Sequence, residues 1–93
     1  MLWLISYDVP DDRKRSSVAA VLATYGVRVQ WSVFECRIEA RALSDIQARI
    51  IAILGESGGG NVRGYRICDR CAGQGWVAGD AVAPIGADTY VIV

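Results

Sequence analysis

Apolar positions in the first third of the chain predict one strand followed by one helix. Residues 2–7, LWLISY, are almost continuously apolar, which is typical of a central strand covered on at least one face. Pro10 lies just beyond this run and cannot donate to a strand ladder, so we expect the strand to end near Asp8. Helical spacing then gives residues 12–25 one apolar face, formed by Val18, Val21, Leu22 and Tyr25.

Acidic and small residues mark the two ends of this predicted helix. Asp11 or Asp12 can accept hydrogen bonds from the free backbone N–H groups of the first turn. Gly26 follows the last apolar position, and we expect it to end the helix as a C′ residue.

The next segment, residues 27–39, is predicted to be extended but not continuous. Its sequence, VRVQWSVFECRIE, alternates and is rich in β-branched and aromatic residues. In one unbroken strand, Phe34 would fall on the face that carries the polar side chains. We therefore expect a bulge or tight turn near Gln30–Ser32, which divides the segment into two short strands.

The second half of the chain predicts another helix and two further strands. Residues 42–54 place Leu43, Ile46, Ile50, Ile53 and Leu54 on one side of a helix. Residues 55–60, GESGGG, predict a flexible loop, and residues 61–67 predict a strand. Residues 72–88 are rich in Gly and Ala. Residues 89–93, TYVIV, predict a C-terminal strand, which must pair with another strand.

The predicted order is β-α-β-β-α-β followed by an extra C-terminal strand. This order is typical of an α+β, ferredoxin-like fold, with two helices on one face of an antiparallel sheet. We expect a single domain over residues 1–93, with a core in residues 1–67 and a C-terminal tail and strand in residues 68–93. Because this fold carries many unrelated activities, the function must be argued from particular residues.

Composition and charge narrow the classes of partner. The chain has 93 residues, of which 53% are hydrophobic, and this excess suggests apolar area buried between subunits. Ten basic and ten acidic residues give a formal net charge of zero. Any binding of nucleic acid must therefore come from locally clustered charge.

The absence of histidine limits the possible chemistry. It excludes a histidine general base, histidine metal ligands and Ser-His or Cys-His nucleophile pairs. An enzyme of this composition must rely on carboxylates and a metal. The N-terminal apolar run is too short for a signal peptide or a membrane span, so we expect a cytoplasmic protein with no membrane partner.

Three cysteines, Cys36, Cys68 and Cys71, do not form a recognisable framework. The odd count argues against a secreted disulfide scaffold. The CDRC segment supplies only two of the four ligands that structural zinc needs, unless a second subunit supplies the others. It also lacks the thioredoxin-like context of a redox pair, and two incidental thiols remain the simplest interpretation.

Asp8, at the end of the first predicted strand, is the candidate for catalysis and metal binding. A carboxylate at a sheet rim can bind a hard cation such as Mg²⁺. One carboxylate makes a poor site, whereas two brought together by a dimer two-fold axis make a plausible one. The alternative is that the Asp8 side chain only caps a turn.

Three consecutive bases, Arg13, Lys14 and Arg15, fall in the first turns of the predicted helix. Cations there oppose the helix dipole, so their presence needs an explanation. They either pair with the neighbouring acids or contact phosphates of a nucleic acid.

Two motifs together resemble the CRISPR-associated Cas-two family of small adaptation endonucleases. The first is YDVPDDRKR after an apolar strand, and the second is YGVRVQWSVFEC after the first helix. The family pattern combines Tyr-Asp at the end of the first strand with a Gly-x-Arg-(Val/Ile)-Gln-x-Ser-Val-Phe-Glu segment. The resemblance covers residues 1–67. Ser17 departs from it where some members carry a second Arg, for which Arg13 or Lys14 could compensate.

The resemblance implies a homodimer in which Asp8 of each subunit binds one shared Mg²⁺. It also places a set of further side chains near the cleft that would bind nucleic acid: Tyr7, Arg15, Arg28, Ser32 and Phe34. Family members act as metal-dependent endonucleases on RNA or double-stranded DNA and partner the Cas-one integrase in spacer acquisition. The family's C-terminal strand commonly adds to a sheet edge of the partner subunit.

Two functional hypotheses follow. In the first, the protein is a Mg²⁺-dependent endonuclease in which Asp8 holds the metal. In the second, it is a non-catalytic dimeric adaptor that bridges integrase subunits and binds the DNA backbone through its arginines. A ligand-binding or toxin-type module of the same fold is a third interpretation, supported by the fold alone.

Overall fold

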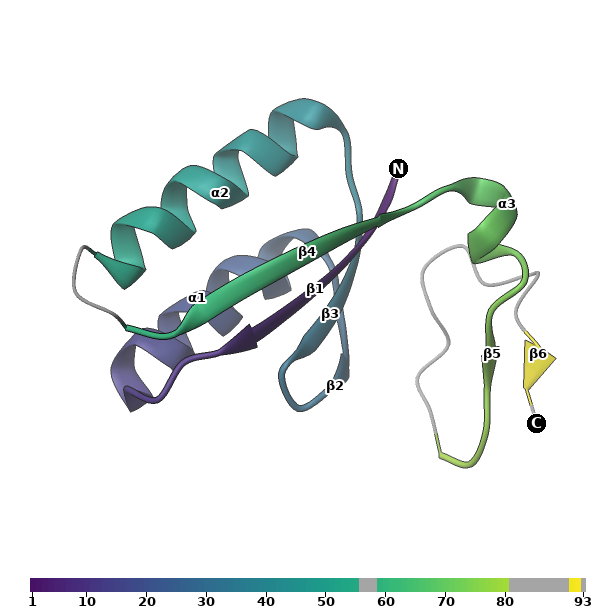
Figure 1. The fold of residues 1–93 in the computed structure, drawn as a ribbon, viewed down its shortest axis with the longest axis horizontal. Helices are drawn as coiled ribbons and strands as arrows, with labels where there is room; N and C mark the ends of the chain where they lie inside the picture. Colours follow the sequence, from purple (N-terminus) through teal and green to yellow (C-terminus); the bar gives the residue numbers. More distant parts are fainter. Residues whose placement is uncertain (56–58, 81–90, 93) are drawn as a thin grey trace.

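The protein is built around a four-stranded antiparallel sheet (Figure 1). The computed structural model describes residues 1–55, 59–80 and 91–92. The elements are β1 (Leu2–Asp8), α1 (Asp12–Tyr25), β2 (Val27–Gln30), β3 (Val33–Arg37), α2 (Ala40–Leu54), β4 (Asn61–Ile67), α3 (Asp69–Ala72), β5 (Trp76–Val77) and β6 (Val91–Ile92). The strand order β2-β3-β1-β4 places β1 in the interior of the sheet, as the apolar run predicted. The βαββαβ order and this topology confirm the ferredoxin-like fold.

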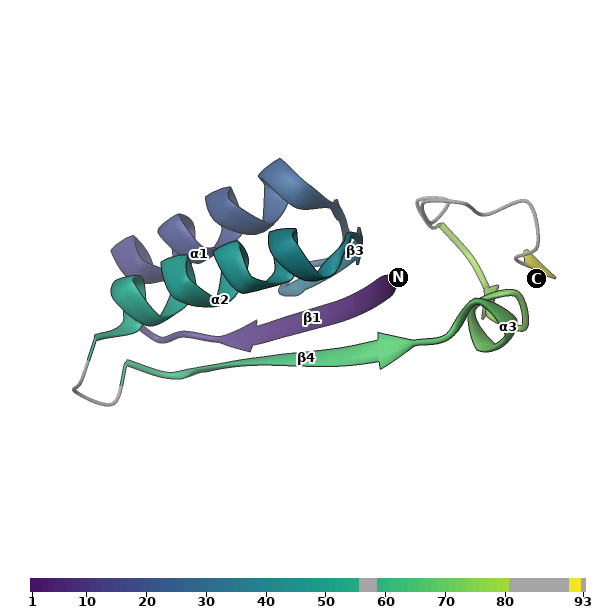
Figure 2. The ribbon, with the colours of Figure 1, turned by 90° about the horizontal axis from the view of Figure 1, so that it is seen from above.

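Both long helices cover the same face of the sheet (Figure 2). The core between them is built from alternate residues of the strands, among them Ile5, Tyr7 and Phe34. Val18 and Leu22 of α1 face it and are fully buried. The predicted apolar faces of both helices are therefore confirmed, because Ile46 and Ile50 of α2 are buried in the same cluster.

The helix boundaries agree closely with those expected from the sequence. Asp11 is the N-cap of α1, and its side chain accepts a hydrogen bond from the Lys14 backbone N–H at 2.8 Å. The second helix begins at Ala40, two residues before the predicted start at Ala42, and ends as predicted at Leu54.

Gly26 ends α1 for a reason that differs from the one expected. A C′ glycine is usually needed because the backbone is left-handed, but Gly26 is extended, with φ of −159°. A Cβ at this position would lie 2.4 Å from the Glu35 carbonyl oxygen and 2.5 Å from Cys36 Sγ. The close approach of β3 to the end of α1 therefore requires the glycine.

The hairpin of β2 and β3 confirms the predicted break in the extended segment. Residues 31 and 32 form the turn, and the register shifts between Arg28 and Gln30. This irregularity lets Phe34 point into the core, where only 2% of it is exposed.

Beyond β4 the described chain forms a short helix, α3, and a small sheet. In that sheet β5 and β6 pair in parallel, with Trp76 opposite Val91 and Val77 opposite Ile92. The predicted C-terminal strand is thus seen at Val91–Ile92, while residues 89, 90 and 93 lie outside the described residues. Residues 56–58 of the predicted loop also lie outside them. No helix among the described residues is long and apolar enough to cross a membrane.

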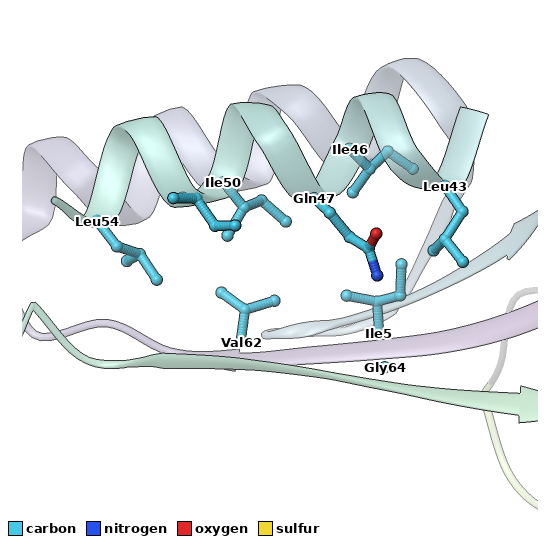
Figure 3. Close-up of a pocket in the computed structure, with 9 residues that line it drawn as sticks. Ile5, Leu43, Ile46, Gln47, Ile50, Leu54, Val62 and Gly64 are labelled. Carbon is cyan, nitrogen blue, oxygen red and sulfur yellow. The ribbon is translucent and has the colours of Figure 1, made fainter. Parts of the chain in front are cut away.

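An apolar cavity of about 220 Å³ lies between α2 and the edge strand β4 (Figure 3). Gly64 contributes no side chain to its floor, and Gln47 projects into it from α2. The lining is otherwise formed by Ile5, Leu43, Ile46, Ile50, Ile51, Leu54 and Val62. Because no charged side chain lines this cavity, it is unsuited to phosphate chemistry, and the candidate site lies elsewhere.

Candidate functional site

Asp8 occupies the C-terminal end of β1, where its side chain is exposed. Side chains alternate along a strand, and Ile5 and Tyr7 point toward the helices, so Asp8 shares the opposite face with Leu4 and Ser6. Across the sheet Asp8 pairs with Asn61 of β4. Within the described residues, neither a hydrogen bond nor an ion pair engages the Asp8 carboxylate.

The chemistry of this carboxylate fits a hard cation, but one chain supplies only one such ligand. Carboxylate oxygens are preferred ligands of Mg²⁺. Asp11 is engaged as the cap of α1, and Asp12 forms an ion pair with Arg15. The described residues contain no group of three or more Cys, Asp or Glu side chains that could hold a metal. Asp8 is therefore the acid at this end of β1 with no described hydrogen bond or ion pair.

Next to Asp8, Tyr7 connects β1 to the β2–β3 hairpin. Its backbone N–H donates to the Ser32 carbonyl at 3.1 Å, and its hydroxyl donates to the Trp31 carbonyl at 3.3 Å. Arg28 donates to the Tyr7 hydroxyl at 3.3 Å, and its guanidinium carbon lies 5.2 Å from the centre of the Phe34 ring. The structure thus brings together four of the residues expected near the site: Tyr7, Arg28, Ser32 and Phe34.

Two of the three consecutive bases are held by backbone carbonyls. Arg15 donates to the carbonyls of Val9 at 3.1 Å and Pro10 at 3.2 Å, in addition to its ion pair with Asp12. Lys14 donates through Nζ to the Leu54 carbonyl at 3.1 Å, at the end of α2. These contacts close the loop between β1 and α1 and join the two helices. Arg13 is exposed, and its side chain makes no ion pair with a described residue.

The sheet face opposite the helices carries apolar and charged side chains together. Leu4, Tyr65 and Glu35 meet there, because Leu4 pairs with Glu35 on one side and with Tyr65 on the other. Tyr65 is 53% exposed. One oxygen of Glu35 is buried without a described hydrogen-bond partner, and burial raises the pKa of this carboxyl group.

The CDRC segment forms the start of α3. The Cys71 backbone N–H donates to Cys68 Sγ at 3.3 Å, and this hydrogen bond, together with one from the Cys71 thiol, lowers the pKa of Cys68. The pKa of Cys71 is raised because its thiol donates to Cys68. Cys36 is buried in the core, and burial raises its pKa to about 11.

Trp31 is the residue beside the site that reasoning from the sequence did not single out. It lies in the hairpin turn, 81% exposed, and its ring centre is 5.9 Å from the guanidinium carbon of Arg28. In an unbroken strand Trp31 would have joined the valines of the same segment. The signal in the sequence was the predicted break at Gln30–Ser32, which has an aromatic residue at its centre.

The fold and the site define a ferredoxin-like protein with an exposed carboxylate at the end of an interior strand and an arginine–aromatic cluster at the same end of the sheet. The family model described as CRISPR associated protein Cas2 matches residues 1–74, and the chain belongs to this family. A relative from Chloroflexus aurantiacus, named CRISPR-associated endoribonuclease Cas2 1, is 37% identical over 93 residues. The match covers 99% of this chain and 100% of the relative.

Solved structures agree with this assignment. A hypothetical protein from Thermus thermophilus superimposes with a TM-score of 0.77 at 37% identity, covering 89% of this chain and 95% of that protein. Cas2 of Streptococcus pyogenes, determined at pH 6.5, superimposes with a TM-score of 0.66 at 32% identity. That match covers 73% of this chain and 87% of the Streptococcus protein.

Proposed function

We propose that the protein is a Mg²⁺-dependent endonuclease that hydrolyses phosphodiester bonds in RNA or double-stranded DNA and acts in CRISPR spacer acquisition. The observation that carries this proposal is the exposed Asp8 carboxylate at the end of β1, which no described side chain engages. The names of relatives add support, since the Chloroflexus protein is called an endoribonuclease and a Thermus thermophilus relative an endonuclease.

The active unit in this proposal is a homodimer in which Asp8 of both chains would hold one Mg²⁺. When bound, the ion would act as a Lewis acid toward an oxygen of the scissile phosphate. A dimer is supported by the sheet face that bears Asp8, because both long helices cover the opposite face (Figure 2). By strand register Leu4 and Tyr65 lie on the same face as Asp8, and Tyr65 is 53% exposed.

Arg28 is a preordered cation at the same end of the sheet as Asp8. Its guanidinium is oriented by the Tyr7 hydroxyl and by the Phe34 ring, so it loses little conformational freedom when it meets a phosphate. A cation held in this way can stabilise the negative charge that develops on the phosphate during hydrolysis. Arg15 is expected to act indirectly, by fixing the loop that follows Asp8.

Replacing Asp8 tests the proposed endonuclease. Asp8→Asn keeps the shape of the side chain but removes the charge that binds the cation, and we expect cleavage of labelled RNA or duplex DNA to fall at least about 100-fold. The matched control is Glu39→Gln, since Glu39 is an exposed acid before α2 whose side chain makes no capping bond. The measurement is the single-turnover rate over a Mg²⁺ titration.

The proposal is wrong if Asp8→Asn cleaves at the wild-type rate while its circular dichroism and sedimentation match those of the wild type. An equal loss in Glu39→Gln would also contradict it, because it would point to a general effect of removing surface charge.

A second candidate function, a non-catalytic adaptor for the Cas-one integrase, is supported by the limited set of catalytic groups. The chain has no histidine, and no described acid accompanies Asp8 as a general base. In this role the dimer would bind the DNA backbone through its arginines. Measuring spacer integration by the integrase in the presence of the Asp8→Asn variant separates the two functions. Integration is retained if the protein is an adaptor and is lost if its nuclease activity is essential.

A further inference from the structure

Trp31 presents a large aromatic ring to solvent at the same end of the sheet as Asp8. It is the most exposed large apolar side chain among the described residues, at 81%. Single exposed apolar residues are common on protein surfaces and need no explanation by themselves. Trp31 differs because its backbone is anchored and a cation lies on its ring.

The turn that carries Trp31 is tied to β1 by two hydrogen bonds. The Trp31 carbonyl accepts from the Tyr7 hydroxyl at 3.3 Å, and the next carbonyl, that of Ser32, accepts from the Tyr7 backbone N–H at 3.1 Å. Tyr7 itself is 94% buried, as only 6% of it is exposed. A buried residue therefore fixes the backbone of the turn, and the indole has a defined starting position.

Arg28 lies between the exposed and the buried aromatic ring. Its guanidinium carbon is 5.9 Å from the Trp31 ring centre and 5.2 Å from the Phe34 ring centre. These distances allow cation–π attraction to both rings. Because most of the Trp31 ring remains exposed, a planar group can stack on it while the neighbouring guanidinium meets a negative charge.

Asp8 and Trp31 lie at the same end of the sheet although 23 positions separate them in sequence. The residue before Asp8 pairs through its backbone with the residue after Trp31, as Tyr7 bonds to Ser32. The Asp8 side chain points to the face opposite the helices, whereas the Tyr7 side chain, which bonds to the Trp31 carbonyl, points toward them. The indole and the carboxylate are therefore separate contact points at this end of the sheet.

We propose that Trp31 is a stacking platform for an unpaired nucleobase of single-stranded nucleic acid, with Arg28 contacting the adjoining phosphate. This inference rests on the proposed function and adds a binding residue to it: the bound strand is unpaired where it meets Trp31. Stacking on an aromatic side chain tolerates any base, because every base has a π face. The platform therefore selects single strands over duplexes and does not select a sequence.

The test measures binding separately from cleavage. Fluorescein-labelled oligouridine of 12 nucleotides, and an RNA duplex of equal length, are titrated by fluorescence anisotropy without added Mg²⁺. We expect Trp31→Ala to weaken single-strand binding about 5- to 100-fold and to leave duplex binding within about twofold. Trp31→Tyr retains an aromatic ring and is expected to stay within about threefold of the wild type.

Trp76→Ala is the matched control. Trp76 is also exposed, at 66%, but it lies in β5 beyond the four-stranded sheet, so its removal should change neither affinity. Equal affinity of Trp31→Ala and wild type for oligouridine overturns the proposal. So does an equal loss toward the duplex, which would reveal a backbone contact, or dissociation of the dimer in sedimentation, which would place Trp31 between subunits.

The outcome does not depend on the nuclease assay. If Asp8→Asn abolishes cleavage and Trp31→Ala binds oligouridine normally, the proposed endonuclease is supported and the proposed stacking platform is contradicted. If Asp8→Asn cleaves normally but Trp31→Ala loses single-strand affinity, the proposed stacking platform is supported and the proposed active site is contradicted.

Discussion

The sulfur atoms of Cys68 and Cys71 are close in sequence but differ in their hydrogen bonds. Cys68 Sγ accepts from the Cys71 backbone N–H at 3.3 Å, which stabilises its thiolate, whereas Cys71 donates its own proton to Cys68. The pKa of Cys68 is therefore lowered and that of Cys71 raised. Both side chains are exposed, in contrast to Cys36 in the core.

These differences predict the order in which the thiols react. At neutral pH a larger fraction of Cys68 is thiolate, so iodoacetamide should modify Cys68 several-fold faster than Cys71 and leave Cys36 almost unmodified in the folded protein. The lowered pKa also shifts the rate–pH profile of Cys68 to lower pH than that of a free thiol. Peptide mass mapping over time measures all three rates.

Cys71→Ser is the control for this prediction, because it keeps the backbone N–H that bonds to Cys68 Sγ. Cys68 should remain fast in this variant. If iodoacetamide modified Cys71 before Cys68 in the wild-type protein, the described hydrogen bonds would not govern the reactivity of these thiols.

At the scale of elements, the junction between α1 and β2 depends on the absence of a side chain at Gly26. The carbonyl of Glu35 and the sulfur of Cys36 occupy the space that a Cβ would need. Because β3 lies in the interior of the sheet, neither group can move aside without disturbing its strand pairing.

We expect Gly26→Ala to lower the free energy of unfolding by about 1–3 kcal/mol or more through overpacking. Gly64→Ala is the matched control, since its Cβ would meet the Trp3 ring at 3.5 Å, an ordinary contact beside the apolar cavity. That change should be neutral or stabilising by up to about 1 kcal/mol. Urea denaturation followed by tryptophan fluorescence measures both variants. Equal stability of Gly26→Ala and wild type would contradict the packing argument.

The elements were predictable from the sequence where local signals agree with the tertiary fold. The cap at Asp11 and the apolar spacing of Val18 and Leu22 define α1, and the misplaced Phe34 revealed the hairpin. The reason for Gly26 was not predictable, because the groups that crowd it come from β3.

The candidate site was predictable in part, for a related reason. Asp8, Tyr7 and Arg28 follow from motifs, and the structure brings them to one end of the sheet. The partners of Arg15 are backbone carbonyls of the preceding loop, and residue types do not reveal such contacts. The exposure of Trp31 depends on the register shift in the hairpin. Strict alternation along one strand would instead place Trp31 on the same face as the neighbouring valines.

At the scale of the whole molecule, the two faces of the four-stranded sheet differ in what covers them. Both long helices cover one face (Figure 2), and the other carries Leu4, Tyr65 and the Asp8 carboxylate. The described residues of one chain place a single unengaged carboxylate at this end of β1, where a Mg²⁺ site needs more than one good ligand. In the proposed dimer, joining two copies through this face would supply the second carboxylate and cover the apolar surface in one step.

The measurement that tests this account most directly is the stoichiometry of Mg²⁺ binding by isothermal titration calorimetry. Two Asp8 carboxylates that share one ion predict one Mg²⁺ for every two chains, and no comparable binding in Asp8→Asn. Glu39→Gln should bind as the wild type does. One Mg²⁺ per chain, or unchanged binding by Asp8→Asn, would contradict the shared site.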